Sequence, residues 1–237
     1  MKTVKENGQL AVVAKRQLAK LGTDQKNNIL AVCAKALRDN AEFIVGENAK
    51  DMENAKNNNM PQGLQDRLML NVDRVNAMAE GLELIEKLPD PIGEVLDMRT
   101  LPNGLTVGQK RVPMGVIGII YEARPNVTSD AFGLCLKAGS AVILRGGSDA
   151  IHSNIATVSV FRKAIEDLGY NPDFVQLVED TTRASSTEMM TLNDYIDLLI
   201  PRGGKGLIQS VVKNATVPVI ETGVGNCHIY MDESGKI

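Results

Sequence analysis

Residues 113–147 read PMGVIGIIYEARPNVTSDAFGLCLKAGSAVILRGG, and this stretch decides the fold. It begins with a short apolar run at 115–120, rich in β-branched residues, which predicts a buried strand. Helical spacing follows at 127–138, and a second apolar run at 141–144 leads into two glycines. A strand, a helix and another strand in this order indicate parallel strands joined by a crossover helix.

The chain beyond residue 147 repeats this alternation. Because strands that are buried on both faces read as continuous apolar runs, the pattern indicates a doubly wound parallel sheet with helices on both faces, an α/β fold. The further strands are expected at 174–178, 196–200, 217–220 and 228–231, and the helices near 150–168, 183–191 and 206–213.

Residues 1–90 precede this alternation and form a helical region. Thr23 is a suitable N-cap for a helix that carries apolar residues at helical spacing, and Asn71 is a suitable N-cap for a later one. The asparagines at 57–59 and Pro61 mark a break between helices.

A protruding β-hairpin arm is expected at 94–112, where Asn103-Gly104 suits a two-residue type I′ turn. A two-stranded ribbon alone is marginally stable in water, so the arm must pack on something, such as another subunit. We therefore expect one domain, 1–237, made of the helical region 1–90, this oligomerisation hairpin at 94–112 and an α/β part at 113–237.

Composition excludes several classes of function. With 26 Lys plus Arg against 29 Asp plus Glu, the net charge of −3 argues against a nucleic-acid footprint. No apolar run approaches the roughly 20 residues that span a bilayer. The three cysteines are too few and too scattered for a disulfide framework, and the two histidines lie too far apart to hold a metal. These features predict a cytoplasmic protein with reduced thiols, without a metal, membrane or nucleic-acid partner.

Ligands of open parallel sheets bind at the carboxyl ends of the strands, which selects four turns here. In the first turn, Asn126 is either a helix cap or an amide donor to a developing oxyanion, and Arg124 is either a surface charge or a binder of an anionic substrate group. The second turn, 145–148, is either a phosphate cradle or a plain strand-to-helix turn capped by Ser148.

The other two turns differ in how clearly they indicate a phosphate site. The third, 201–206, holds three glycines and two cations in six residues, which favours phosphate binding. The fourth, 221–225, is weaker, because its G-x-G lacks a third glycine and Glu221 is either a general base or a solvated carboxylate. Cys227 just after it is a small packing residue more readily than a nucleophile, because no base is paired with it.

Three long motifs resemble the gamma-glutamyl phosphate reductase family, namely 111–147, IDLLIPRGGKGLI at 196–208 and PVIETGVGNCHIYMDES at 218–234. The segments 66–70 (DRLML) and 90–95 (DPIGEV) also match, and the aldehyde dehydrogenase superfamily, with its Rossmann-like cofactor domain, is a more distant likeness. The resemblance implies reduction of L-glutamate 5-phosphate by NADPH to L-glutamate 5-semialdehyde, with release of phosphate, in proline biosynthesis. In that family a cysteine thiolate attacks the acyl phosphate, and hydride transfer to the thioester gives the aldehyde.

The resemblance also implies roles for residues. Asn126 matches an oxyanion donor, and Glu221 matches the carboxylate that oxidising relatives use as a general base beside the cofactor. Arg124 would bind the substrate. The cofactor-binding set consists of Arg145, Gly146, Gly147, Ser148, Arg202, Gly203, Gly204 and Glu221, with the Arg145 guanidinium suited to the 2′-phosphate of NADP.

One feature of the family has no match. Its nucleophilic cysteine lies beyond the region that matches 218–223, and none of Cys33, Cys135 and Cys227 corresponds to it. We therefore expect an N-terminal, cofactor-binding portion that is inactive alone and homo-oligomeric at full length. The alternatives are a non-catalytic dinucleotide-binding or assembly module and a relative of the CoA-acylating aldehyde dehydrogenases.

Overall fold

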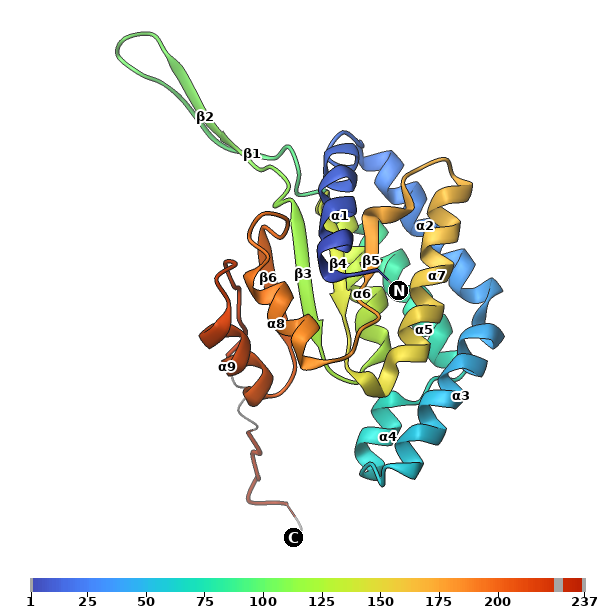
Figure 1. The fold of residues 1–237 in the computed structure, drawn as a ribbon. Helices are drawn as coiled ribbons and strands as arrows, with labels where there is room; N and C mark the ends of the chain where they lie inside the picture. The colour runs from blue at the N-terminus through green and yellow to red at the C-terminus, as the bar shows by residue number, and fades with distance from the viewer. Residues whose placement is uncertain (1, 224–227, 236–237) are drawn as a thin grey trace.

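A parallel four-stranded sheet lies at the centre of the computed structural model, which describes residues 2–223 and 228–235 (Figure 1). The strand order is β5-β4-β3-β6, and every pairing is parallel. The strands are β3 (Val116–Tyr121), β4 (Ala141–Arg145), β5 (Val175–Leu177) and β6 (Leu198–Arg202). The predicted α/β class with a parallel sheet is confirmed.

Alternate residues of β3 face two separate cores. Ile117 and Ile119 point into a core that includes α6 (Pro125–Lys137) and α7 (Ile151–Asp167), whereas Val116 and Ile120 point into a second core on the other face. All six residues of β3 are buried, which explains why its sequence is apolar throughout instead of alternating with polar residues.

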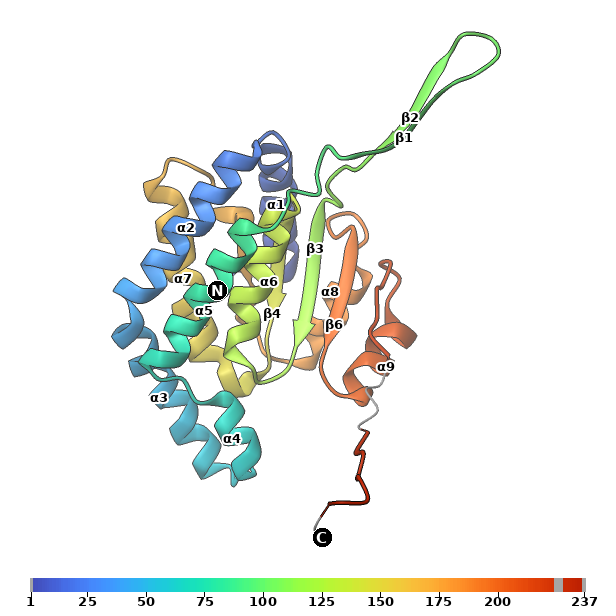
Figure 2. The ribbon, with the colours of Figure 1, turned by 180° about the vertical axis from the view of Figure 1, so that it is seen from behind.

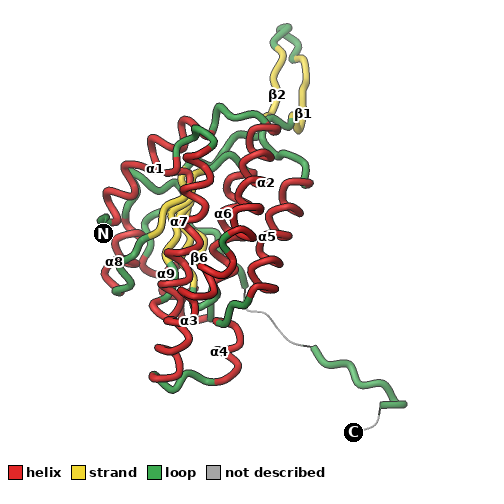
Figure 3. The backbone as a smooth tube through the Cα atoms, turned by 90° about the vertical axis from the view of Figure 1, so that its right-hand side faces the viewer, coloured by secondary structure: helices red, strands yellow, loops and turns green. Residues whose placement is uncertain are grey.

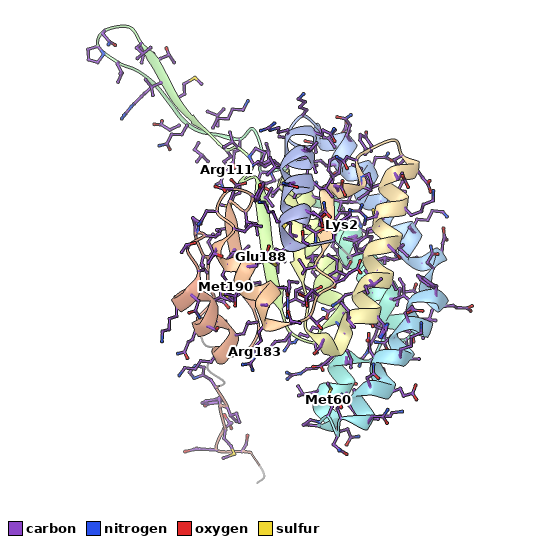
Figure 4. The ribbon with its side chains drawn as sticks, in the orientation of Figure 1. Lys2, Met60, Arg111, Arg183, Glu188 and Met190 are labelled. Carbon is purple, nitrogen blue, oxygen red and sulfur yellow. The ribbon has the colours of Figure 1, made fainter. Side chains whose placement is uncertain are left out.

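The helices divide between these two faces. One face is covered by α1 (Val4–Leu18), α8 (Arg183–Thr191) and α9 (Lys205–Asn214), and the other by α6 and α7 (Figures 1 and 2). A further layer packs outside α6 and α7, as the side view shows (Figure 3). It contains α2 (Thr23–Asp39), α3 (Ala41–Asn57) and α5 (Val72–Lys87), with the short α4 (Gln62–Leu68) beside α3.

The helical region is therefore split by the sheet. Val4 and Ala11 of α1 join the core of the α8 face, whereas the end of α1, with Ala14 and Leu18, reaches the other core, which α2, α3 and α5 join. Thr23 is the first helical residue of α2 and not its N-cap, which is Gly22. The Thr23 hydroxyl instead donates to Asp90 Oδ2 at 2.8 Å, and Gln25 Oε1 accepts from the Gly22 amide at 3.0 Å. Asn71 caps α5 as expected, since its Oδ1 accepts from the Arg74 amide at 2.8 Å.

Two predicted strands near the end of the chain need correction. The 217–220 segment contributes a single parallel bridge, Leu199 to Val219, in place of a full strand. The strand predicted at 228–231 is wrong, because Ile229 and Tyr230 are 93% and 88% exposed and these residues pair with none of the other described segments. An apolar run forms a strand only where a neighbouring strand takes its backbone hydrogen bonds.

The hairpin projects from the sheet end at which β3 and β6 begin (Figure 1). It consists of β1 (Val95–Thr100) and β2 (Thr106–Lys110), and every residue of both strands is exposed. Its turn is not type I′. Gly104 N donates to Leu101 O at 2.9 Å and Leu101 N to Leu105 O at 2.8 Å, which is a three-residue loop with Gly104 at φ +84°. A type I′ turn would also need a positive φ at Asn103, and Asn103 does not have one.

Candidate functional site

The order of the strands creates a crevice at one edge of the sheet. From β3 the chain moves outward to β4 and β5, then returns to the other side of β3 as β6. The connections at the carboxyl ends of β3 and β6 therefore diverge, and such a switch point is where open α/β sheets bind ligands. In Figure 1 this edge faces downward, away from the hairpin.

A pocket of about 260 Å³, here called the crevice pocket, lies at this switch point. It combines the predicted first and third turns, because Arg124 lines it together with the turn that follows β6. Tyr121, Val127 and Thr222 contribute to its wall, and its remaining residues are Arg67, Glu122, Arg124, Arg202, Gly203 and Gly204.

The turn after β6 presents an open helix end to the crevice pocket. Gly204 is the N-cap of α9 and offers no side chain, and the first bond inside the helix runs from Ile208 N to Gly204 O at 3.2 Å. The amide groups of residues 205–207 precede that bond and point out of the helix end. Such an end, with Lys205 at the first helical position, is suited to an anion such as phosphate.

The second predicted turn lies beside the first. A side chain built at Gly147 would lie 3.6 Å from the Ala123 amide, so the backbones of the two turns are adjacent. Gly146 is needed for packing, because a Cβ there would lie 2.3 Å from Asn154 Nδ2 and 3.1 Å from Tyr121 Cζ. Ser148 is exposed and begins a short 3₁₀ turn, Ser148–Ala150, that leads into α7.

Arg145 already has protein partners. Its guanidinium donates to Thr181 O at 2.5 Å, to Thr182 O at 2.8 Å and to Gly146 O at 3.2 Å. The side chain is buried, and that burial lowers the pKa of Arg145, against the opposing charge of Asp180. Among the described residues its Nε has no partner. Arg145 thus holds the segment that precedes α8, a role that the sequence did not reveal.

Asn126 occupies the second position of α6, so the helix-cap alternative is wrong. Pro125 takes the first position, where its missing N–H does no harm, and Arg124 is the N-cap residue without a side-chain cap. Asn126 Nδ2 donates to Asp130 Oδ2 at 3.4 Å. Burial raises the pKa of Asp130, partly offset by this hydrogen bond and by the charge of Arg202.

Asn126 opens onto a second pocket of about 290 Å³, here called the α6 pocket. Met69, Met78 and Asp130 are among its other lining residues, together with Arg67 and Arg74. Arg67 lines both pockets and was missed by sequence reasoning. The sequence feature that could have indicated Arg67 is the 66–70 segment, which matches the family. That segment lies in the helical region, where no ligand site was predicted.

Glu221 is exposed and does not line the crevice pocket, although the next residue, Thr222, does. The predicted fourth turn continues into residues 224–227, and Cys227 among them lies outside the described residues. The structure brings Arg124 and the 202–204 turn together, with the Arg145 turn alongside and Glu221 apart.

The two described cysteines are unsuited to nucleophilic attack. Cys33 and Cys135 are buried, and burial raises the pKa of Cys33 and raises the pKa of Cys135 to about 12. Neither thiol is therefore ionised near neutral pH. Within residues 2–223 and 228–235, three or more side chains suited to a metal do not gather anywhere, and no helix has the length and apolar character to cross a membrane.

The chain is similar to one family of known proteins. The model of the aldehyde dehydrogenase family matches residues 1–234. The gamma-glutamyl phosphate reductase of Lachnospira eligens is 56% identical over 237 residues, which are 100% of this chain and 57% of that protein. The reductase of the same name from Heliobacterium modesticaldum is 58% identical over 230 residues, which are 97% of this chain and 55% of that protein. The chain thus spans about half the length of the curated relatives it matches.

Solved structures agree with this family match. The gamma-glutamyl phosphate reductase of Thermotoga maritima, 43% identical, superposes with a TM-score of 0.93 over 98% of this chain and 56% of its own. The reductase of the same name from Saccharomyces cerevisiae, 28% identical, gives 0.84 over 93% of this chain and 56% of its own. A propionaldehyde dehydrogenase from Rhodopseudomonas palustris, 18% identical, shares the fold with a TM-score of 0.72 over 95% of this chain and 46% of its own.

Proposed function

This chain belongs to the aldehyde dehydrogenase family, and we propose that it is the cofactor-binding part of a cytoplasmic enzyme of proline biosynthesis. The reaction is the reduction of L-glutamate 5-phosphate by NADPH to L-glutamate 5-semialdehyde, with release of phosphate. The observation that carries this proposal is the crevice pocket at the switch point, with its open helix end and its arginines, in a chain so similar to gamma-glutamyl phosphate reductases.

The residues present fit a nicotinamide dinucleotide. The open end of α9, after Gly203 and Gly204, suits a pyrophosphate, since its amide groups point out of the helix. The neighbouring 145–148 turn suits the adenosine end, where the charge of Arg145 and the exposed Ser148 hydroxyl favour a 2′-phosphate. NADPH, when bound, is the source of the hydride. Glu221 is assigned to the cofactor set by the likeness to the family alone, since it does not line the crevice pocket.

The reacting end of the substrate belongs beside α6. Arg124 at the rim of the crevice pocket binds an anionic group of the substrate, and the Asn126 amide donates to the oxygen that develops negative charge. Both described cysteines are buried, so the nucleophile is not among the described residues, and we expect the 237-residue chain to be inactive alone. That burial also favours a second candidate function, a dinucleotide-binding or assembly module without chemistry of its own.

The hairpin belongs to self-association of the full-length protein. Its apolar side chains stand in the open, with Leu96 and Met98 52% and 63% exposed. A ribbon of two strands gains stability only by packing, and a second copy of the chain would cover it.

Two assays test the proposal. In the first, calorimetry with the purified chain is expected to detect NADPH binding, and mixing the chain with glutamate 5-semialdehyde, phosphate and NADP is expected to give no NADPH. In the second, residues 1–234 are joined to the remaining C-terminal portion of the Lachnospira eligens reductase, and this fusion is expected to form NADPH in the same mixture. Turnover by the chain alone, or a folded but inactive fusion, would overturn the proposal.

A further inference from the structure

Three arginines line the crevice pocket from three different elements. Arg67 comes from α4, Arg124 from the turn before α6, and Arg202 from the end of β6. All three are exposed, and none forms an ion pair or side-chain hydrogen bond with another described residue. By contrast, Arg74 beside the α6 pocket is held by Asp66 and by the Met69 carbonyl oxygen.

The charges around this pocket do not balance. Glu122 is the one carboxylate among the described residues that line it, and its Oε1 already accepts from the Gly204 amide at 3.1 Å. Three unpaired cations around a pocket of about 260 Å³ repel one another, and an anion placed between them removes that repulsion. Guanidinium groups match the geometry of phosphate oxygens by paired hydrogen bonds.

We propose that Arg67, with Arg124 and Arg202, binds the phosphate of an acyl phosphate substrate, an assignment that rests on the function proposed above. Arg202 thereby moves from the cofactor set to the substrate set. The amide groups at the start of α9 and the 145–148 turn remain for the dinucleotide.

The position of Arg67 favours the substrate's phosphate over a phosphate of the cofactor. Arg67 lines the α6 pocket as well as the crevice pocket, and Asn126 opens onto the α6 pocket. A phosphate at Arg67 therefore places the acyl carbon that carries it toward Asn126. The 145–148 turn, which remains for the dinucleotide, follows β4 and so lies on the other side of β3 from Arg202 and β6.

Arg67 is the specificity-determining residue in this arrangement. It belongs to the helical region and not to the sheet, so α4 and the 69–71 linker set its place beside the two strand ends. Arg74 fixes that linker through its bonds to Asp66 and Met69. The helical region thus contributes a residue to the substrate site in addition to its part in the core.

The test is a calorimetric titration of the purified 237-residue chain with inorganic phosphate at constant ionic strength. Arg67→Gln is expected to weaken phosphate binding by about tenfold or more, because two charge-assisted hydrogen bonds are lost. Arg67→Lys keeps the charge but not the paired donors, so its phosphate affinity is expected to lie between those of the wild type and Arg67→Gln. The matched control is Arg16→Gln, at an exposed arginine of α1 without a partner among the described residues, and it is expected to bind like the wild type.

Two further titrations identify the source of the anion. Saturating NADP is expected to leave phosphate binding by the wild type intact, whereas displacement would assign Arg67 to the cofactor and overturn the proposal. With L-glutamate in place of phosphate, the wild type and Arg67→Gln are expected to bind with equal affinity. If Arg67→Gln weakens the binding of L-glutamate but not that of phosphate, the anion at Arg67 is a carboxylate and the proposal fails.

The phosphate affinities themselves can also overturn the proposal. Equal phosphate affinity of Arg67→Gln and the wild type, or no measurable affinity in the wild type, overturns the proposal. These readouts use binding alone, so they are separate from the turnover that tests the proposed reaction. An inactive fusion enzyme with intact, Arg67-dependent phosphate binding would reject the proposed reaction and leave the anion site in place.

Discussion

Glu122 Oε1 accepts a hydrogen bond from the Gly204 amide at 3.1 Å, and this contact joins the carboxyl ends of β3 and β6. A side chain built at Gly203 would lie 2.8 Å from the Glu122 carboxyl carbon, so the turn and the carboxylate fit closely. The same contact places a negative charge beside Arg124 and Arg202. Glu122 therefore both shapes the crevice pocket and weakens its attraction for anions.

Glu122→Gln is predicted to raise the affinity for inorganic phosphate. The amide oxygen of glutamine still accepts from Gly204, while the like charge beside the anion is removed, and we expect a gain of about three- to tenfold. Calorimetry at low ionic strength measures it, with Glu53→Gln at an exposed position of α3 as the control. A loss of phosphate affinity in Glu122→Gln would contradict the electrostatic account.

Asp90→Asn is predicted to destabilise the fold. Lys26 Nζ lies 2.6 Å from Asp90 Oδ2, and the two side chains are 2% and 9% exposed. Replacing the carboxylate leaves a buried ammonium group without its counter-charge, which costs about 3 kcal/mol or more. The free energy of unfolding in urea measures this. Asp39→Asn, which breaks the exposed Lys35–Asp39 pair of α2, is the control and should change little.

The destabilisation in Asp90→Asn is also predicted to depend on pH. Burial alone would raise the pKa of Asp90, but hydrogen bonds from Lys26, the Ile92 amide and Thr23 outweigh it and lower the pKa. Its contribution to stability is thus complete above the unfolded pKa of about 3.9 and is lost as the pH falls through the lower folded value. Urea unfolding at a series of pH values measures the difference in the free energy of unfolding between the wild type and Asp90→Asn. This difference should become smaller in acid, and a difference that does not change with pH would count against this ion pair.

Gly115→Ala is predicted to lower stability. Gly115 has φ +112°, a conformation that alanine rarely adopts, and a built Cβ would lie 2.1 Å from Asp197 Oδ2. That oxygen cannot easily move, since it accepts from the Val116 amide at 2.7 Å and from Lys15 at 2.6 Å. We expect a loss of about 1–3 kcal/mol or more from the backbone alone. Gly46→Ala, in a helix with open space around it, is the control and should be neutral or stabilising.

Arg145→Ala is predicted to lower the preference for NADPH over NADH. Because Arg145 also binds the carbonyl oxygens of Thr181 and Thr182, its loss disturbs the site for both cofactors, and only the ratio of the two affinities isolates the 2′-phosphate. We expect that ratio to fall by about tenfold. Calorimetry with both cofactors measures it. An unchanged ratio with reduced thermal stability would make Arg145 a purely structural residue.

The double substitution Leu96→Asp and Met98→Asp is predicted to weaken self-association. Both residues belong to β1 of the hairpin and both are more than half exposed, so the introduced charges should leave the fold intact. Analytical ultracentrifugation measures the oligomeric state, and circular dichroism checks the fold. Equal association by wild type and variant at every concentration would remove the hairpin from the interface.

Much of the architecture was predictable from local pattern. The apolar runs at 115–120 and 141–144 became β3 and β4 within a residue, because strands buried on both faces have few polar positions. Helix α8 begins and ends where the spacing predicted. The hairpin was predicted as well, but its turn type was not, since Asn-Gly occurs in more than one kind of loop and the backbone angle of Asn103 decides between them.

The candidate site was predictable only in part. Strand-end turns at Arg145 and Arg202 follow from the fold class, because carboxyl ends of parallel strands share one edge. Sequence spacing did not show that Arg145 binds two carbonyl oxygens of the next connection, or that Asn126 lies inside its helix. Such contacts join segments that are far apart along the chain, and hydrophobic periodicity, which relates near neighbours, does not predict them.

The sequence by itself determined which segments are strands and helices and which turns carry glycines and cations, because hydrophobic period and turn chemistry act between near neighbours. Only the tertiary structure decided that β6 returns beside β3 and that α4 brings Arg67 to the same edge. These placements depend on burial of whole faces against one another, a condition that belongs to the assembled core and not to any one segment.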